Sequence, residues 1–97
     1  MIDFEWDPGK STTNLRQHGV AFSEAATVFR DPLSITAYDP DHSEEEARFI
    51  TVGASVAGRL LIVAHANRDP RTRIIGARKL TRSEREAYEK EIQRRKG

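Results

Sequence analysis

The sequence predicts one small α+β domain, in which an antiparallel sheet of four to five strands carries two N-terminal helices and one C-terminal helix. Three observations predict this class. The 97 residues have room for one modest core. Apolar runs with strand-like alternation fill the middle of the chain, and helix-capping signals stand near both ends. We therefore expect the element order β-α-α-β-β-β-β-α within a single domain, residues 1–97.

A short strand and a helix open the chain. Ile2–Trp6 alternates apolar and acidic residues, which is typical of a strand. Asp7 is a favourable N-cap, and Pro8 after it suits the first helical position. The helix is expected to end at His18, because Gly19 is a common C-terminal stop.

A second helix and four strands follow. Ser23 is predicted to cap a helix through Phe29, which Asp31-Pro32 ends. The next strands are separated by polar or glycine-containing turns and are expected at Leu33–Tyr38, Ala47–Gly53, Arg59–Asn67 and Thr72–Leu80. The third of these is the most apolar, so we expect it at the centre of the sheet.

The last helix begins with a capping box. In Thr81-Arg82-Ser83-Glu84 the first and fourth residues can satisfy each other's backbone N–H groups, and the helix is expected to run to about Arg95. The two N-terminal helices can cover one face of the sheet. The other face is also partly apolar, so the C-terminal helix or another chain is expected to cover much of it.

The last hairpin brings cations next to a histidine. With a turn centred on Asp69, His65 is expected opposite Arg73. Strict alternation then places Arg73 and Lys79 on one face and Arg78 on the other. Gly76 could form a bulge that re-aims Arg78.

The charges are unevenly distributed along the chain. Residues 1–49 hold four basic and ten acidic side chains, a net charge of −6, whereas residues 50–97 hold twelve basic and five acidic ones, a net charge of +7. A basic region attracts polyanions, and RNA is the first candidate partner. The acidic half could meet a basic protein. The alternative is solvated surface charge without a partner.

Several classes of protein are excluded or disfavoured. The chain has no cysteine, so it forms neither disulfides nor cysteine-based metal sites. Its three histidines lack metal-ligand spacing, and the weak signal of Asp39, Asp41 and His42 is set aside, so no metal or other cofactor is expected. No apolar run approaches the roughly 18 residues of a membrane span, and no signal segment is apparent. We expect a cytoplasmic protein without membrane contact.

Cations on the last predicted strand are candidates for phosphate chemistry. Arg73 and Arg78 can clamp a phosphate and stabilise the charge of a pentacoordinate transition state. Lys10, after the first strand, is an isolated further cation. The alternative for the arginines is an edge strand protected from aggregation by charge, and for Lys10 a solvated first helical turn.

The candidate acid–base groups each have a structural alternative. His65 beside a cation could accept the proton of a ribose 2′-hydroxyl, or could be a hydrogen-bonded core histidine. Tyr88 could stack on a base or donate to phosphate, or could anchor its helix in the core. Further RNA contacts are expected from Lys79, Arg82, Arg85, Glu84 and His18. The alternative for Lys79 is the charged edge strand, for Glu84 the cap of the last helix, and for His18 the end of the first helix.

Seven stretches of the chain resemble one family: F-E-W-D-P-G-K (4–10), N-L-R-Q-H-G-V-A-F (14–22), A-A-T-V-F-R-D-P (25–32), D-P-D-H-S (39–43), A-R-F-I-T-V-G (47–53), G-R-L-L-I-V-A-H (58–65) and R-I-I-G-A-R-K-L-T-R-S-E-R-E-A-Y (73–88). They are similar to BrnT, the toxin of a bacterial type II toxin–antitoxin pair. The resemblance implies a RelE-like fold and a metal-independent endoribonuclease that cleaves cellular RNA and arrests translation and growth.

The resemblance also implies a partner. It would be a BrnA-type antitoxin with a ribbon-helix-helix DNA-binding domain, in a complex of two copies of each chain that represses its own promoter. Operator DNA would be contacted only through the antitoxin, which would cover the basic groove. The family's matching polar positions are Lys10, His18, His65, Arg73, Arg78, Glu84 and Tyr88. One departure is Gly76, where the family usually has Ser.

The leading hypothesis is RNA cleavage by attack of the 2′-oxygen on the adjacent phosphate. Arg78 and Arg73 would stabilise the developing charge. His65 or Lys10 would help remove the 2′ proton, and Tyr88 would orient or protonate the leaving side. The alternatives are a non-catalytic module that binds RNA or ribosomes, a co-repressor subunit, or a small structural domain.

Overall fold

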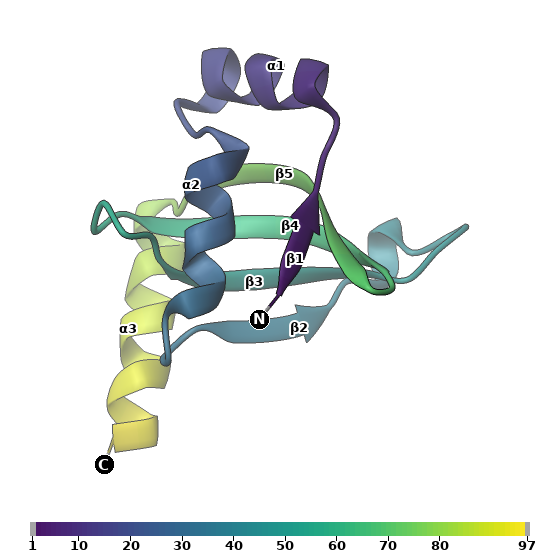
Figure 1. The fold of residues 1–97 in the computed structure, drawn as a ribbon. Coiled ribbons are helices and arrows are strands. Elements are labelled where there is room, and N and C mark those ends of the chain that lie inside the picture. Colours follow the sequence, from purple (N-terminus) through teal and green to yellow (C-terminus); the bar gives the residue numbers. More distant parts are fainter. Residues whose placement is uncertain (1, 97) are drawn as a thin grey trace.

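A five-stranded sheet with three α-helices makes up residues 2–96, the part of the chain that the computed structural model describes (Figure 1). The elements follow the predicted order and are β1 Asp3–Glu5, α1 Pro8–His18, α2 Phe22–Thr27, the 3-10 turn η1 Val28–Arg30, β2 Ile35–Tyr38, the 3-10 turn η2 Pro40–His42, β3 Arg48–Ala54, β4 Leu60–Arg68, β5 Arg71–Lys79 and α3 Arg82–Lys96. The sheet order is β1-β5-β4-β3-β2, so the most apolar strand is central, as predicted. Within residues 2–96, no helix combines the length and the hydrophobicity that a membrane crossing needs.

The prediction of a wholly antiparallel sheet is wrong, because β1 pairs with β5 in parallel. Asp3 lies opposite Arg71 and Glu5 opposite Arg73. Two helices separate β1 from the other strands, so the chain can bring this strand back in either direction. The alternation of residues 2–6 predicts a strand but does not identify its partner strand, β5, which lies almost 70 residues further along the chain.

Local capping signals set the limits of α1, whereas burial sets those of α2. The Asp7 carboxylate accepts two backbone N–H groups at 2.7 and 3.2 Å, and Gly19 ends the helix at φ 70°, both as predicted. Ser23 does not cap α2, contrary to the prediction. The helix begins one residue earlier at Phe22, which is fully buried, and its N-cap residue Ala21 makes no side-chain bond. Burial of a large aromatic side chain has overridden the preference for a hydroxyl cap.

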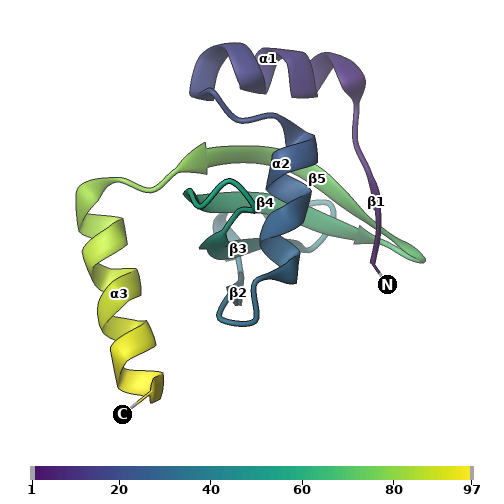
Figure 2. The same cartoon turned by 60° about the vertical axis from the view of Figure 1, so that its left-hand side comes forward.

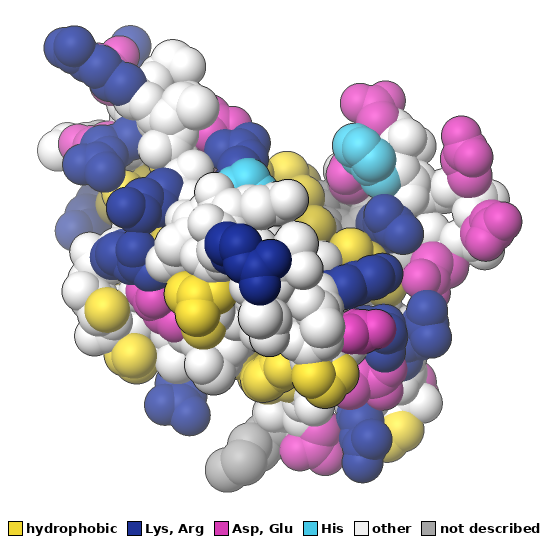
Figure 3. All heavy atoms as spheres, turned by 90° about the horizontal axis from the view of Figure 1, so that it is seen from above, with side chains coloured by type: hydrophobic (Ala, Val, Ile, Leu, Met, Phe, Trp, Pro, Cys, Tyr) yellow, Lys and Arg dark blue, Asp and Glu magenta, His cyan; other side chains and the backbone are white. Residues whose placement is uncertain are grey.

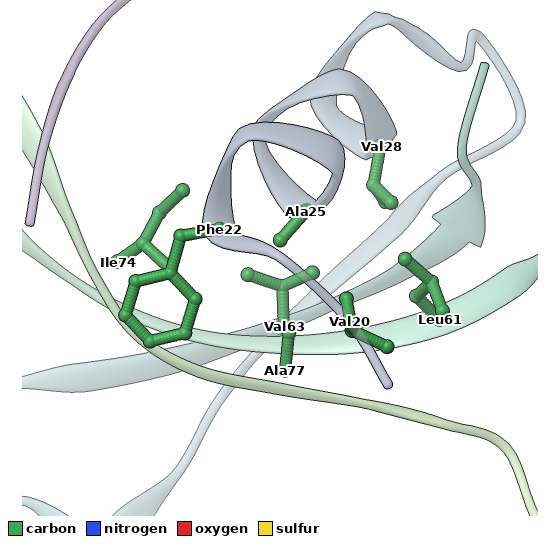
Figure 4. Close-up of a cluster of buried hydrophobic side chains, with 8 residues drawn as sticks. All are labelled: Val20, Phe22, Ala25, Val28, Leu61, Val63, Ile74 and Ala77. Carbon is green, nitrogen blue, oxygen red and sulfur yellow. The ribbon is translucent and has the colours of Figure 1, made fainter. Parts of the chain in front are cut away.

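The core lies between the sheet and the segment from Val20 to η1. It is a cluster of apolar side chains from α2 and its flanking residues and from β4 and β5, made up of Val20, Phe22, Ala25, Val28, Leu61, Val63, Ile74 and Ala77. In Figure 4 the side chains of α2 point toward those of β4 and β5. One face of the sheet is therefore covered, as expected from the two N-terminal helices.

A β-bulge interrupts the pairing of β4 with β5. Ala64 lies opposite Gly76, but the next residue, His65, lies opposite Ile74, so Ile75 is extra. The bulge is thus one residue before the predicted position at Gly76. It reverses the alternation along β5, because an extra residue exchanges the two faces beyond it.

The bulge corrects the predicted arrangement of the cations. His65 faces Ile74 rather than Arg73. Arg73 and Arg78 share the face of the sheet that the helices leave open, since both are neighbours of core residues on the same strand. Lys79 pairs with the buried Leu61 and lies on the covered face. The predicted grouping of Arg73 with Lys79 is therefore wrong.

The second face of the sheet stays largely uncovered. Helix α3 leaves the end of β5 and runs along the side of the molecule (Figures 1 and 2). None of its residues 82–96 is buried. The expectation that the C-terminal helix covers this face is therefore not met, and the apolar strand residues there line a cleft.

Candidate functional site

The open face of the sheet carries a cleft, here called the open-face cleft. Its floor consists of short or apolar strand residues of the open face, namely Ile50, Ile62, Ala64 and Gly76, and the buried Ala77 also lines it. Its rim consists of polar side chains from α1, η2 with its preceding residue, β5 and α3, namely Asn14, His18, Asp39, His42, Arg78 and Glu84. In Figure 3 a hollow with apolar side chains separates a lobe rich in Lys and Arg, at the α3 side, from a lobe rich in Asp and Glu.

Arg78 enters the cleft from β5 and is held by Glu84. Its two Nη atoms donate to the two carboxylate oxygens of Glu84 at 2.7 and 2.9 Å. Glu84 also accepts the backbone N–H of Thr81 at 2.8 Å, while its own N–H donates to the Thr81 hydroxyl at 3.2 Å, which completes the predicted capping box. The guanidinium and this backbone N–H together hold the pKa of Glu84 at about 2. The Arg78 side chain remains 42% exposed, so its remaining donors are accessible.

The low pKa of Glu84 predicts a pH dependence of stability. Because the folded-state pKa is about 2 and the usual value is 4.5, the folded state favours the carboxylate. Its contribution to the free energy of unfolding is therefore present above about pH 4.5 and is lost as the pH falls toward 2. We expect Glu84→Gln to be less stable than wild type at pH 6 and to lose less stability between pH 5 and pH 2, as measured by urea unfolding.

A matched control for this prediction is Glu89→Gln on the same helix. Glu89 forms no ion pair among residues 2–96 and is exposed. It should show the same acid limb as wild type. Equal slopes for wild type and Glu84→Gln would contradict the assignment.

Two histidines lie on the rim of the cleft. His18 is the last residue of α1. His42 lies in η2, and its Nδ1 is 2.8 Å from Oδ2 of Asp39. Sequence reasoning included His18 but set His42 aside. The spacing of Asp39 and His42 was the available signal, because residues three apart in a helical turn are neighbours.

The other predicted cations lie outside the cleft. Arg73 donates to Glu5 at 2.8 Å, at the junction of β5 with β1. Lys10 is exposed and lines a separate hollow beside α1 that also includes Ile75. Lys79 faces the covered side of the sheet. The structure thus brings Arg78, but none of these three, into the open-face cleft.

Helix α3 directs its predicted site residues other than Glu84 away from the cleft. Arg82 and Arg85 are exposed and line a shallow hollow on the helix surface. The Tyr88 hydroxyl donates to the backbone carbonyl of Leu33 at 3.2 Å, and burial raises its pKa. Tyr88 therefore fastens α3 to the segment before β2, and only Glu84 of this helix reaches the cleft.

His65 is a core residue on the covered face. It is 5% exposed, and its Nε2 lies 2.8 Å from the Thr51 hydroxyl. Its ring lies against Phe29 and Phe49 at centroid distances of 4.8 and 6.0 Å. Burial lowers the pKa of His65, so the neutral imidazole is favoured, and Nδ1 has no hydrogen-bond partner among residues 2–96. A proton transfer to RNA from this position would require the core to open.

Gly76 leaves space in the cleft beside Arg78. It lies opposite Ala64 on the floor. A Cβ at this position would meet nothing within 4 Å. A serine, which the resemblance described above implies for this position, would therefore fit here and place a hydroxyl in the cleft.

Metal ligands do not gather in the part of the chain that the structure describes. Asp39 and His42 lie together, but no group of three or more His, Cys, Asp or Glu side chains within residues 2–96 is arranged to hold a metal ion. The polar groups of the cleft are instead an arginine with its carboxylate partner, two histidines, an aspartate and an asparagine.

Comparison with known proteins assigns the family. The family model described as the ribonuclease toxin BrnT of type II toxin–antitoxin systems matches residues 6–84. The fold is similar to the crystal structure of the Brucella abortus ribonuclease toxin BrnT, with a TM-score of 0.62 at 16% identity, over 84% of this chain and 100% of that chain. A comparison with curated proteins finds no match. Because the family model spans most of the sequence, the chain belongs to the BrnT family of ribonuclease toxins of type II toxin–antitoxin systems.

Proposed function

We propose that this chain is an endoribonuclease that binds single-stranded RNA in the open-face cleft and cleaves it by attack of a ribose 2′-oxygen on the adjacent phosphate. Cleavage of cellular RNA would inhibit translation and arrest growth. The observation that carries this proposal is the position of Arg78, a half-exposed cation at the edge of an apolar floor that no helix covers. Membership of a ribonuclease toxin family supports the same reaction.

The cleft suits RNA in two respects. Its floor offers the side chains of Ile50 and Ile62 to the faces of unstacked bases. The guanidinium of Arg78 offers planar N–H donors to a phosphate, and these donors also fit the equatorial oxygens of a pentacoordinate phosphorane. Glu84 fixes the plane of that guanidinium through two hydrogen bonds. Charge neutralisation would thus come from a side chain, and we propose that the reaction needs no metal ion.

A type II toxin is paired with an antitoxin protein. We propose that the antitoxin is of the BrnA type, that two copies of each chain assemble, and that the antitoxin covers the open-face cleft. The partly exposed apolar floor supports this, since a partner would remove it from water. We also propose a RelE-like relationship for the fold, operator binding through the antitoxin alone, and a cytoplasmic site of action. Light scattering on the co-purified pair measures the stoichiometry.

Product chemistry tests the proposed reaction. Purified protein should cut a labelled single-stranded RNA to give a 2′,3′-cyclic phosphate upstream and a 5′-hydroxyl downstream. The same RNA carrying 2′-O-methyl groups should stay intact, because no 2′-hydroxyl can attack. EDTA should leave the rate unchanged.

Expression in a bacterium tests the same reaction in cells. Induction of this chain alone should stop growth and produce discrete new 5′-hydroxyl ends in cellular RNA. Growth arrest with intact RNA, or binding of the labelled RNA without products, would contradict the proposal and favour a non-catalytic binding module.

A further inference from the structure

Two histidines of different elements meet at the open-face cleft, and they suggest how protons move there. We propose that His42, held by Asp39, is the general base that takes the 2′ proton, and that His18 is the general acid that protonates the leaving 5′-oxygen. This inference rests on the proposed function, because it assigns catalytic groups to that reaction. Neither role belongs to the arginine and lysine side chains that the sequence predicts to bind phosphate.

The hydrogen bond between Asp39 and His42 occupies one ring nitrogen and leaves the other, Nε2, for a substrate. A carboxylate can only accept, so Nδ1 of His42 carries the hydrogen that Oδ2 of Asp39 accepts at 2.8 Å. In the neutral ring, Nε2 then holds the lone pair. Asp39 is 20% exposed and His42 is 66% exposed, so the acceptor is the sheltered partner and the imidazole is open to a substrate. The carboxylate also stabilises the imidazolium that forms when Nε2 takes a proton.

His18 has a different environment. It is the last residue of α1, and its neighbour Gly19 ends the helix. The free carbonyls of a helix C-terminus carry partial negative charge, which favours a cation and so suits a proton donor. Both histidines line the same cleft with Arg78. Figure 3 shows imidazole groups on two sides of the hollow.

The charges around His42 fix the direction in which RNA would lie. Near it are charged side chains of η2, the following loop, β3 and β4, namely Asp41, Glu44, Glu45, Glu46, Arg48 and Arg68. Glu46 and Arg68 neutralise each other through bonds of 2.8 and 3.0 Å, so carboxylates dominate the rest. This wall repels phosphates, whereas Arg78 attracts them. The scissile phosphate therefore belongs at Arg78, with the neutral 2′-hydroxyl toward His42.

The proposed step conserves atoms and charge. Nε2 of His42 removes the hydrogen of the 2′-hydroxyl while the 2′-oxygen forms a bond to phosphorus. The bond from phosphorus to the 5′-oxygen breaks, and protonated His18 supplies the hydrogen to that oxygen. The products are a 2′,3′-cyclic phosphate and a 5′-hydroxyl, with the proton now on His42. Exchange with water restores the starting protonation of both rings.

The pH profile of cleavage tests this assignment. kcat/KM on a fluorescent single-stranded RNA should follow a bell-shaped curve, with one limb from each histidine. His42→Ala should lower kcat/KM about a hundredfold and remove the acid limb, and added imidazole should restore part of the rate. His18→Ala should remove the alkaline limb.

Asp39 acts through His42 and is a positioning residue, so its variant should behave differently. Asp39→Asn should lower kcat/KM about tenfold or more and shift the acid limb without removing it. Asp41→Asn is the matched control. It removes the same charge from the 3-10 turn that follows Asp39, and its carboxylate makes no bond to His42. Because Asp41 is only one member of the acidic wall, its variant should lower kcat/KM much less than Asp39→Asn does.

The outcomes separate this inference from the proposed function. If wild type cleaves and His42→Ala or His42→Gln keeps both the rate and the two limbs, the inference is wrong while the ribonuclease function stands. If the wild-type protein leaves RNA intact, both the inference and the proposed function are wrong. Equal losses in Asp39→Asn and Asp41→Asn would reduce the Asp39 contact to a general charge effect and overturn its positioning role. Thermal unfolding of each variant shows whether a lost rate reflects lost folding.

Discussion

Arg78→Ala is expected to lower kcat/KM for RNA about a thousandfold and to abolish growth arrest while the protein stays folded. The guanidinium is the cation that the structure places at the apolar floor, and loss of one preorganised donor to a developing oxyanion costs about 10²–10³ in rate. Arg78→Lys should recover little of this activity, because an ammonium cannot make the bidentate contact with Glu84.

The measurement is single-turnover cleavage of a labelled RNA, together with growth after induction. Arg71→Ala is a suitable control, since Arg71 is an exposed cation at the far end of the same strand. It should retain nearly full activity. Arg73→Ala distinguishes the sequence-based site from the structural one. A loss as large as that of Arg78→Ala would extend the site to the junction with β1, and an active Arg78→Ala would refute the cleft as the site of cleavage.

Asn14→Ala is expected to lower the free energy of unfolding by about 3 kcal/mol. Asn14 is 8% exposed, and its side chain donates to the carbonyls of Val20 and Ala77 at 2.8 and 2.9 Å and accepts the Ala77 N–H at 3.2 Å. The change leaves these buried backbone groups without partners, and each such group costs about 1–3 kcal/mol. The three costs are not additive, because water can enter the space that the amide leaves.

Urea unfolding measures this loss directly. Gln17→Ala is the control on the same helix, where an exposed side chain should change stability by less than about 0.5 kcal/mol. Asn14→Asp should also be destabilised, since a carboxylate cannot donate to the two carbonyls. A variant at position 14 as stable as the control would mean that this amide does not tie α1 to β5.

Features that depend on neighbouring residues could be predicted from the sequence. The caps of α1, the capping box of α3 and the central position of β4 all follow from patterns within a few residues. The parallel pairing of β1 could not be predicted, and the bulge was predicted one residue away from its position at Ile75, because both depend on which distant segments meet. A one-residue register change was enough to exchange the faces of the cations.

The candidate site was predicted only in part, for the same reason. Arg78, Glu84 and His18 lie in the open-face cleft, but His65 belongs to the opposite face of its strand. An apolar strand shows that a histidine is near a core, not whether the ring points into it. His42 was set aside together with the weak metal signal, because only the folded sheet brings η2 to the rim beside residues from α1 and β5.

The carboxylate of Glu84 links two tasks that are usually separate. One and the same side chain closes the first turn of α3 and aims the guanidinium of Arg78. Unwinding or tilting of that turn would release the Arg78 guanidinium from Glu84 even when nothing occupies the cleft. The rest of α3 has no buried residue, so a partner can bind along it. A protein that binds the helix far from the floor of the cleft can therefore inhibit RNA cleavage by moving its first turn, without competing with RNA for the cleft.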